Sequence, residues 1–112
     1  MNIDWAYLRK GWASCKKAQA VFDEKNIGIT EKVEARKQKI EGDDAWQLLG
    51  GSREIVVGRG KKFVIFDPAS DAKQEILKVS LGRTGNLRAP TLKIGNRLIV
   101  GFNDDMYNKY VG

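Results

Sequence analysis

The chain has 112 residues, a length that suits one modest hydrophobic core, and we expect a single domain over residues 1–112. It carries 20 Lys and Arg against 14 Asp and Glu, with no histidine and one cysteine. This composition excludes Ser-His and Cys-His nucleophile pairs, His-based metal sites and an internal disulfide, and we expect no bound metal.

The sequence predicts a cytoplasmic protein. No apolar stretch approaches the roughly 20 residues that span a bilayer, and the first residues lack the charged start and cleavage site of a signal peptide. Lys and Arg are interleaved with acidic residues, as in Glu31–Lys39, and no aromatic-basic pattern of the RNA-binding type occurs. We therefore expect ordinary solvated charge, with nucleic acid an unlikely partner, no membrane contact, and a monomer.

Hydrophobic periodicity predicts a strand, a helix and a second strand at the start of the chain. Ile3–Leu8 is a short apolar run. Ser14–Lys25 has apolar residues at helical spacing: Cys15, Ala18, Val21 and Phe22. Asn26 and Gly28 are typical of a helix end, and Ile27–Val33 alternates as a strand does.

The middle of the chain predicts one short helix and two strands. Asp43 and Asp44 predict a capped start for a helix at 45–49, which a Gly-Gly pair closes. Ile55–Val57 and Phe63–Phe66 have strand composition around a glycine-containing turn. A hairpin is the direct interpretation, although other partners in the domain can override it.

The last third predicts a helix, a hairpin and a final helix. Asp67–Asp71 introduces a helix that ends near residue 80, and Gly82–Asn86 is a loop. Thr91–Ile94 and Arg97–Val100 alternate around Gly-Asn, a two-residue turn sequence that accepts positive φ. Asn103 is a good N-cap for the last helix.

The single thiol stands at the start of a predicted helix, in Gly-Trp-Ala-Ser-Cys-Lys-Lys-Ala. Unpaired backbone N–H groups at a helix start favour the thiolate form. Nearby cations would add to this effect: Arg9, Lys10, Lys16 and Lys17. Trp12 stands three residues before Cys15, and a proline, Pro90, precedes the late hairpin.

Three segments together resemble the arsenate reductase (ArsC)/Spx family: Ser14–Ala18, Leu87–Thr91 and Ile99–Asp105. The resemblance covers both ends of the chain, whereas Glu41–Gly82 matches poorly. It implies an α/β, thioredoxin-like (glutaredoxin-like) fold with a mixed β-sheet flanked by helices, and a cis peptide bond at Pro90. One departure is Ala89, which stands where the arsenate reductases have an arginine.

The resemblance implies thiol–disulfide exchange, in which the group at position 12 attacks and Cys15 resolves the intermediate. It assigns Trp12 and Cys15 as catalytic positions. The implied substrate-binding residues are Ser14, Arg88, Ala89, Pro90 and Thr91. No cofactor is implied, and glutathione or thioredoxin would be the reductant. Because Trp12 replaces the nucleophile, we expect a weak or inactive reductase.

Some members of the family are selenoproteins with selenocysteine at the first position of this pair, and the segment Gly82–Pro90 is similar to their loop. The selenocysteine codon UGA differs by one base from the tryptophan codon UGG. We therefore hypothesise that Trp12 marks a selenocysteine position.

Each of these residues also has a plainer interpretation. Cys15 is otherwise an inert core thiol, Trp12 an apolar plug or an exposed recognition side chain, and Arg88 a surface charge. The alternative function is a non-catalytic regulatory module, because the resemblance to Spx implies binding to RNA polymerase or another protein.

Overall fold

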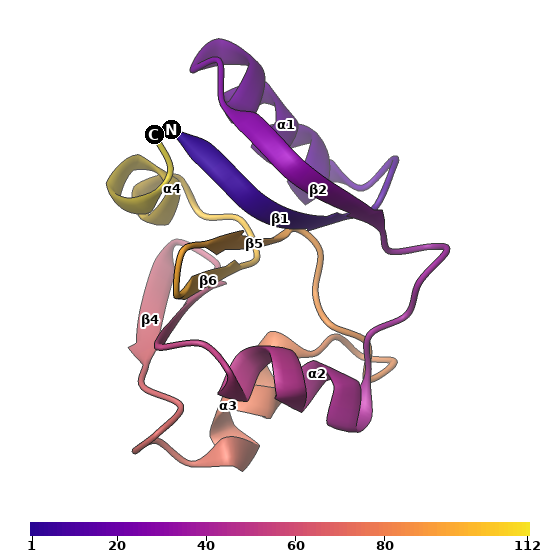
Figure 1. Ribbon diagram of the computed structural model, residues 1–112, viewed down its shortest axis with the longest axis vertical. Helices are drawn as coiled ribbons and strands as arrows, with labels where there is room; N and C mark the ends of the chain where they lie inside the picture. Colours follow the sequence, from indigo (N-terminus) through magenta and orange to yellow (C-terminus); the bar gives the residue numbers. More distant parts are fainter.

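Six strands and four helices make up the computed structural model, which describes residues 1–112 (Figure 1). The elements follow one another as β1 (Asn2–Leu8), α1 (Ala13–Glu24), β2 (Gly28–Glu34), α2 (Gly42–Gly50), β3 (Glu54–Arg59), β4 (Lys62–Phe66), α3 (Lys73–Ser80), β5 (Thr91–Ile94), β6 (Arg97–Val100) and α4 (Asp104–Tyr110). None of the helices is long and apolar enough to cross a membrane.

The strands form one mixed sheet in the order β2-β1-β5-β6-β3-β4. β1 runs parallel to β2, and β3 runs parallel to β6, while the β1–β5, β5–β6 and β3–β4 pairs are antiparallel. A parallel pair needs a crossover, and α1 supplies it between β1 and β2. This sheet flanked by helices confirms the predicted α/β fold and is consistent with a thioredoxin-like fold.

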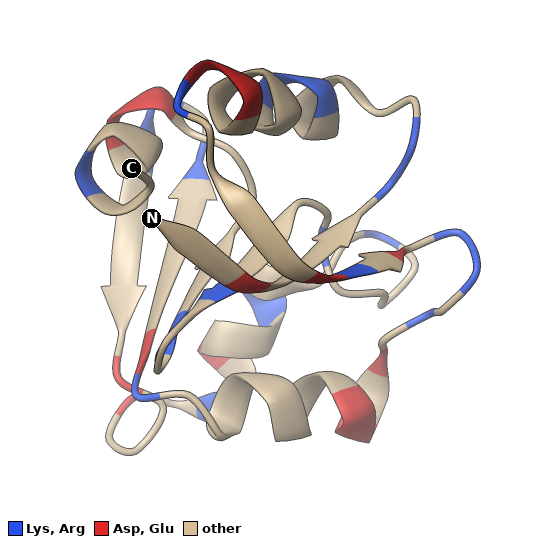
Figure 2. Cartoon of the chain, turned by 45° about the horizontal axis from the view of Figure 1, so that its top comes forward, with Lys and Arg blue, Asp and Glu red and all other residues tan.

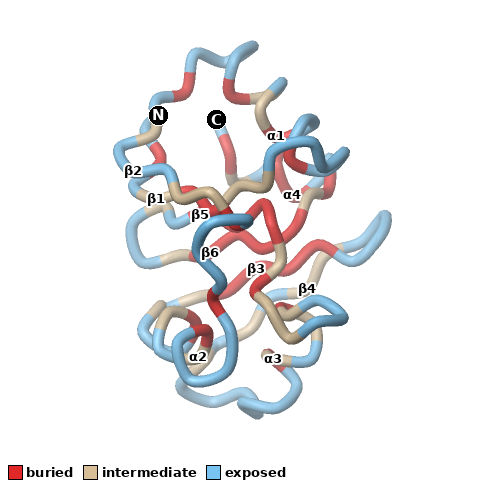
Figure 3. The backbone as a smooth tube through the Cα atoms, turned by 90° about the vertical axis from the view of Figure 1, so that its right-hand side faces the viewer, coloured by how far each residue is buried: buried red, intermediate tan, exposed pale blue.

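Helices cover both faces of the sheet (Figure 1). On one face, α1 and α4 pack on a core of 11 buried residues that includes Phe22 and Tyr107. On the other face, α2 and α3 pack on a core of 13 buried residues that includes Leu49 and Ile76. Figure 3 shows that the buried backbone is concentrated in the central strands, whereas the connecting loops are exposed. Cys15 belongs to the second core, although it lies on α1.

The predicted hairpins are confirmed, since β3 pairs with β4 and β5 with β6. Asn103 is the N-cap of α4, and its side chain accepts a hydrogen bond from the Met106 N–H over 2.9 Å. Asn26 follows α1 with a positive φ of 54°, which fits its predicted role at the helix end.

Two helix starts differ from the prediction. The N-cap of α2 is Glu41, without a side-chain bond, so Asp43 and Asp44 lie inside the first turn. There they act on the positive end of the helix as charges rather than as caps. Asp67–Asp71 forms a turn of its own, in which the Asp71 carboxylate accepts from the Asp67 N–H over 2.7 Å. α3 therefore begins only at Lys73.

Candidate functional site

The loop between β1 and α1 brings the thiol position to one end of the sheet. Trp12 is the N-cap of α1, and Cys15 lies in the first turn of the helix. No side chain caps this end of α1, so its first N–H groups have no side-chain partner. Ser14 is exposed beside them and accepts none of these bonds.

The thiol itself is mostly buried. Cys15 is 6% exposed, and the backbone N–H of Arg9 donates a hydrogen bond to its Sγ over 3.3 Å. Burial raises the pKa of the Cys15 thiol above its ordinary value. The Arg9 N–H opposes that rise, and the negative charge of Glu34 adds to it. The balance favours the neutral thiol, which is the poor nucleophile of the two forms.

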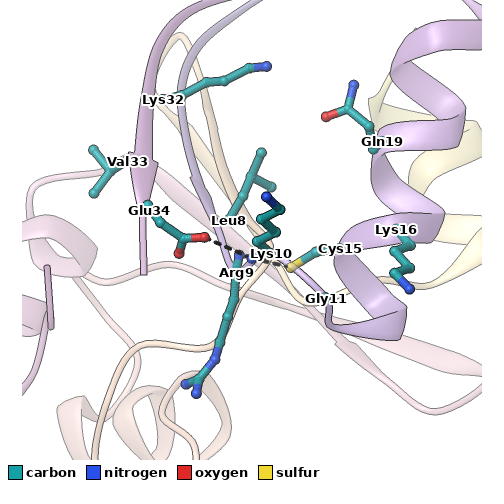
Figure 4. Close-up of a pocket in the computed structure, with 10 residues that line it drawn as sticks. All are labelled: Leu8, Arg9, Lys10, Gly11, Cys15, Lys16, Gln19, Lys32, Val33 and Glu34. Atoms are coloured by element: carbon teal, nitrogen blue, oxygen red, sulfur yellow. Dashed lines mark hydrogen bonds between the residues drawn. The ribbon is translucent and has the colours of Figure 1, made fainter. Parts of the chain in front are cut away.

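A cavity of about 470 Å³ opens beside this thiol, between β2 and the first turns of α1 (Figure 4). Its lining residues are Leu8, Arg9, Lys10, Gly11, Cys15, Lys16, Gln19, Lys32, Val33 and Glu34. Four of these side chains are cationic and one is a carboxylate. The cavity is therefore suited to an anionic group of a partner rather than to a cation.

Glu34 joins the two loops that border the cavity. Its carboxylate accepts from the backbone N–H of Lys10 and from that of Arg36, each over 2.9 Å. These bonds, led by the one from Arg36, hold the pKa of the Glu34 carboxyl below its ordinary value. The carboxylate thus fixes the loop after β1 against the loop after β2.

Trp12 faces solvent rather than the core. Its side chain is 46% exposed, and the Arg9 guanidinium lies 4.4 Å from the centroid of its ring. At this distance the cation and the ring attract each other. Trp12 therefore does not plug the site, and it forms an aromatic–cation pair with Arg9 at the surface.

Basic residues gather at this end of the molecule (Figure 2). A second cavity, of about 350 Å³, shares Arg9 with the first and adds Arg36 and Lys39 from the loop after β2. We name the set that lines the two cavities the basic end: Arg9, Lys10, Lys16, Lys32, Arg36 and Lys39. Trp12 lines neither cavity and contacts this set through Arg9.

The late proline segment, Leu87–Thr91, shares the buried core with Cys15 but not the cavity beside the thiol. The Ala89–Pro90 peptide bond is cis, and Ala89 belongs to the same buried cluster as Cys15. The buried Thr91 hydroxyl donates to the Arg88 carbonyl over 2.6 Å, so it is engaged within the segment. None of these residues lines the cavity beside the thiol.

The Arg88 side chain points to a different part of the fold. Its Nη1 donates to the carbonyls of Gly58 and Val79 over 3.1 and 3.0 Å. It thereby ties the end of β3 to α3. Burial lowers the pKa of this guanidinium, and the positive charge of Arg59 adds to the shift. Its role as an anion ligand stays a prediction, and its bonds support a structural one.

The sequence analysis missed three residues at this site: Lys32, Glu34 and Gln19. The parallel pairing of β1 with β2 places Leu8 opposite Glu34 and so brings the carboxylate to the cysteine loop. The strand pattern was legible in the sequence, whereas this register was not.

No family model matches the chain. The chain is similar to the global transcriptional regulator Spx 1 of Oceanobacillus iheyensis, with 28% identity over 111 residues. The match covers 94% of this chain and 84% of that relative. This similarity supports the ArsC/Spx resemblance of the motifs.

Proposed function

We propose that this chain is a regulatory interaction module of the Spx type, which binds RNA polymerase through the basic end and performs no thiol–disulfide turnover. The observation that carries the proposal is the contrast between Cys15 and Trp12. The only thiol is 6% exposed, whereas the tryptophan at the nucleophile position is 46% exposed. The surface is therefore suited to contact, and the thiol is poorly suited to attack.

Trp12 and Arg9 have the chemistry of binding hot spots. Trp and Arg are enriched among the residues that dominate interface energies, because they combine large area with directed polar contacts. Here the Arg9 guanidinium lies over the Trp12 ring, 4.4 Å from its centroid. Side chains that already contact each other in the free chain lose less conformational entropy when a partner binds.

Charge supports an acidic protein surface as the partner. The chain has a formal net charge of +6, and the basic end concentrates six cations around the two cavities, one of which, Arg9, contacts Trp12. Such a surface speeds association with a complementary acidic one. The relative is a transcriptional regulator by name, which supports a partner in the transcription apparatus, and we place the chain in the cytoplasm accordingly.

The proposal is tested by binding of the folded chain to purified bacterial RNA polymerase at several salt concentrations. Trp12→Ala and Arg9→Ala should each weaken binding by about tenfold or more, as hot-spot truncations do. The Arg9→Ala chain keeps the backbone N–H that bonds Cys15. Added salt should also weaken binding.

Lys73→Ala is the matched control. The Lys73 ammonium lies 5.4 Å from the centroid of the Trp46 ring, so these two residues form a second aromatic–cation pair. They belong to α3 and α2, which cover the other face of the sheet. Its loss should leave the affinity unchanged. Absence of binding by the parent chain, or an equal loss with Lys73→Ala, would reject the basic end as the contact surface.

A second candidate is a thiol or selenol reductase whose attacking group has been lost. It is favoured by the placement of positions 12 and 15 at the N-cap and in the first turn of α1. In that case Trp12 stands for selenocysteine or cysteine, Cys15 is the resolving thiol, and glutathione or thioredoxin is the reductant. Relatives with neither cysteine nor selenocysteine at this position would contradict it.

A further inference from the structure

We propose that β4 pairs antiparallel with β4 of a second copy of this chain, about a two-fold axis at Val64, to form a weak homodimer. β4 is one edge of the sheet, and β2 is the other. The proposed interface therefore lies across the sheet from the basic end and leaves it free. The inference is independent of the proposed function and revises the monomer expected from the sequence.

The backbone of β4 has unused hydrogen-bonding groups along its outer side. Gly58 is the partner of Phe63 in the β3–β4 register, and the Gly58 carbonyl accepts from the Arg88 side chain. This bond agrees with a non-hydrogen-bonded Gly58–Phe63 pair, in which neither residue bonds the other's backbone. Because successive residues of a strand alternate, Phe63 and Ile65 direct their N–H and C=O groups away from β3.

The turn that precedes β4 gives the same alternation. Gly60 has a φ of 60°, and the two-residue turn closes on Arg59 opposite Lys62. A two-residue hairpin closes on a hydrogen-bonded pair, here Arg59 and Lys62, so the next pair along the strands is not hydrogen-bonded. The backbone N–H and C=O of Phe63 therefore again have no partner in β3. No bond outside the sheet uses the backbone of Phe63 or Ile65.

The edge is self-complementary in one register. A two-fold axis at Val64 places Phe63 opposite Ile65 of the second copy, and this pair can exchange two N–H···O bonds on each side of the axis. Phe63 and Ile65 lie on the same face of the strand, and Ile65 is 50% exposed. An aromatic residue opposite a β-branched one is a favourable cross-strand pair. The proposed dimer thus covers the exposed Ile65 side chain.

Charges at the two ends of β4 fit the same register. Lys61 precedes the strand and Asp67 follows it, and both are exposed. The two-fold axis places Lys61 of each copy opposite Asp67 of the other. A register centred on Ile65 would instead use the Asp67 backbone, whose N–H and carbonyl are already bonded within the turn that follows β4.

The first test is the mass of the parent chain in sedimentation velocity. A small, transient interface dissociates at chain concentrations between about 10 μM and about 1 mM. Over this concentration range the mean mass should rise from 12.6 kDa toward twice that value. Ile65→Lys places two like charges at the interface and should keep the chain monomeric. Gln47→Lys, at an exposed position of α2, adds the same charge elsewhere and should dimerise as the parent does.

Cysteine cross-linking tests the register. Val64→Cys should form a disulfide between copies, since opposite residues of a non-hydrogen-bonded pair have Cα atoms about 4.5 Å apart, within disulfide range. Ile65→Cys should not, because the two substituted positions are offset by two residues, about 8 Å apart. Peptide mass spectrometry separates these products from any that involve Cys15.

Three results would overturn the proposal. They are a parent chain that stays at 12.6 kDa throughout the concentration range, an Ile65→Lys chain that dimerises like the parent, and an Ile65→Cys chain that cross-links in preference to Val64→Cys. The first result does not depend on any variant, so a substitution that fails to fold leaves the proposal testable.

Discussion

The backbone N–H of Arg9 donates a hydrogen bond to the Cys15 sulfur over 3.3 Å. The thiol is thereby enclosed by the loop that precedes its own helix. In this place burial outweighs the hydrogen bond and raises the pKa of the Cys15 thiol above its ordinary value. The helix start, which would favour a thiolate in water, does not produce one here.

We predict slow alkylation of Cys15 by iodoacetamide at neutral pH, because only the thiolate reacts. The midpoint of the rate against pH should lie above that of the same chain unfolded in urea. Because the pKa of Cys15 is raised in the folded chain, the protonated thiol favours the folded state. This contribution to the free energy of unfolding is fully present below the pKa of the unfolded thiol and is lost as pH rises through the pKa of the folded one. Fast labelling with a midpoint below the unfolded value would contradict this assignment.

We predict that Trp12→Cys folds and forms a disulfide with Cys15 under mild oxidation. Trp12 is exposed, so its replacement removes little packing beyond the contact with Arg9, worth about 1 kcal/mol or less. Intact-mass measurement would detect the loss of two hydrogens, and a thioredoxin or glutathione assay would then measure cycling. A folded variant that stays reduced would show that positions 12 and 15 lack the geometry of a redox pair.

Arg88→Met should destabilise the fold by about 1–3 kcal/mol, because it removes the donor for the Gly58 and Val79 carbonyls. Chemical denaturation of this variant and of Arg83→Met, an exposed loop control, gives the comparison. An Arg88→Met chain as stable as the parent would return Arg88 to the set of candidate ligand-binding residues.

Tyr107→Phe should stabilise the protein by about 1 kcal/mol. The Tyr107 hydroxyl is buried with no hydrogen-bond partner, and burial raises its pKa far above the ordinary value. Tyr7→Phe should have the opposite effect, since the Tyr7 hydroxyl donates to the Gln38 carbonyl over 2.6 Å. Thermal unfolding of both variants measures the signs, and destabilisation by Tyr107→Phe would show that its hydroxyl does have a partner.

The sequence carried enough local pattern to predict most elements. Alternation around the Gly95-Asn96 turn predicted the β5–β6 hairpin, and strand composition on either side of a glycine-containing turn predicted the β3–β4 hairpin, because short turns bring neighbouring strands together. Asn103 was legible as an N-cap for the same local reason. The α2 and α3 starts were misplaced because acidic residues are frequent both in turns and in first helical turns.

The candidate site was only partly legible. The position of Cys15 at a helix start could be predicted, but its enclosure by Arg9 depends on the path of a loop. Arg88 was ambiguous because its acceptors lie 30 and 9 residues away, and no local pattern specifies such contacts. Glu34 reaches the site through strand pairing over a separation of 26 residues, Leu8 to Glu34.

The central claim is that this chain acts by contact and not by thiol chemistry. Its most direct test is the affinity of Cys15→Ala for purified bacterial RNA polymerase, beside the parent chain, with circular dichroism to show that both are folded. The account predicts the same affinity for the two chains, because Cys15 is only 6% exposed and offers a partner little contact area. A parent chain that binds only with its thiol intact, while the folded variant does not bind, would contradict it.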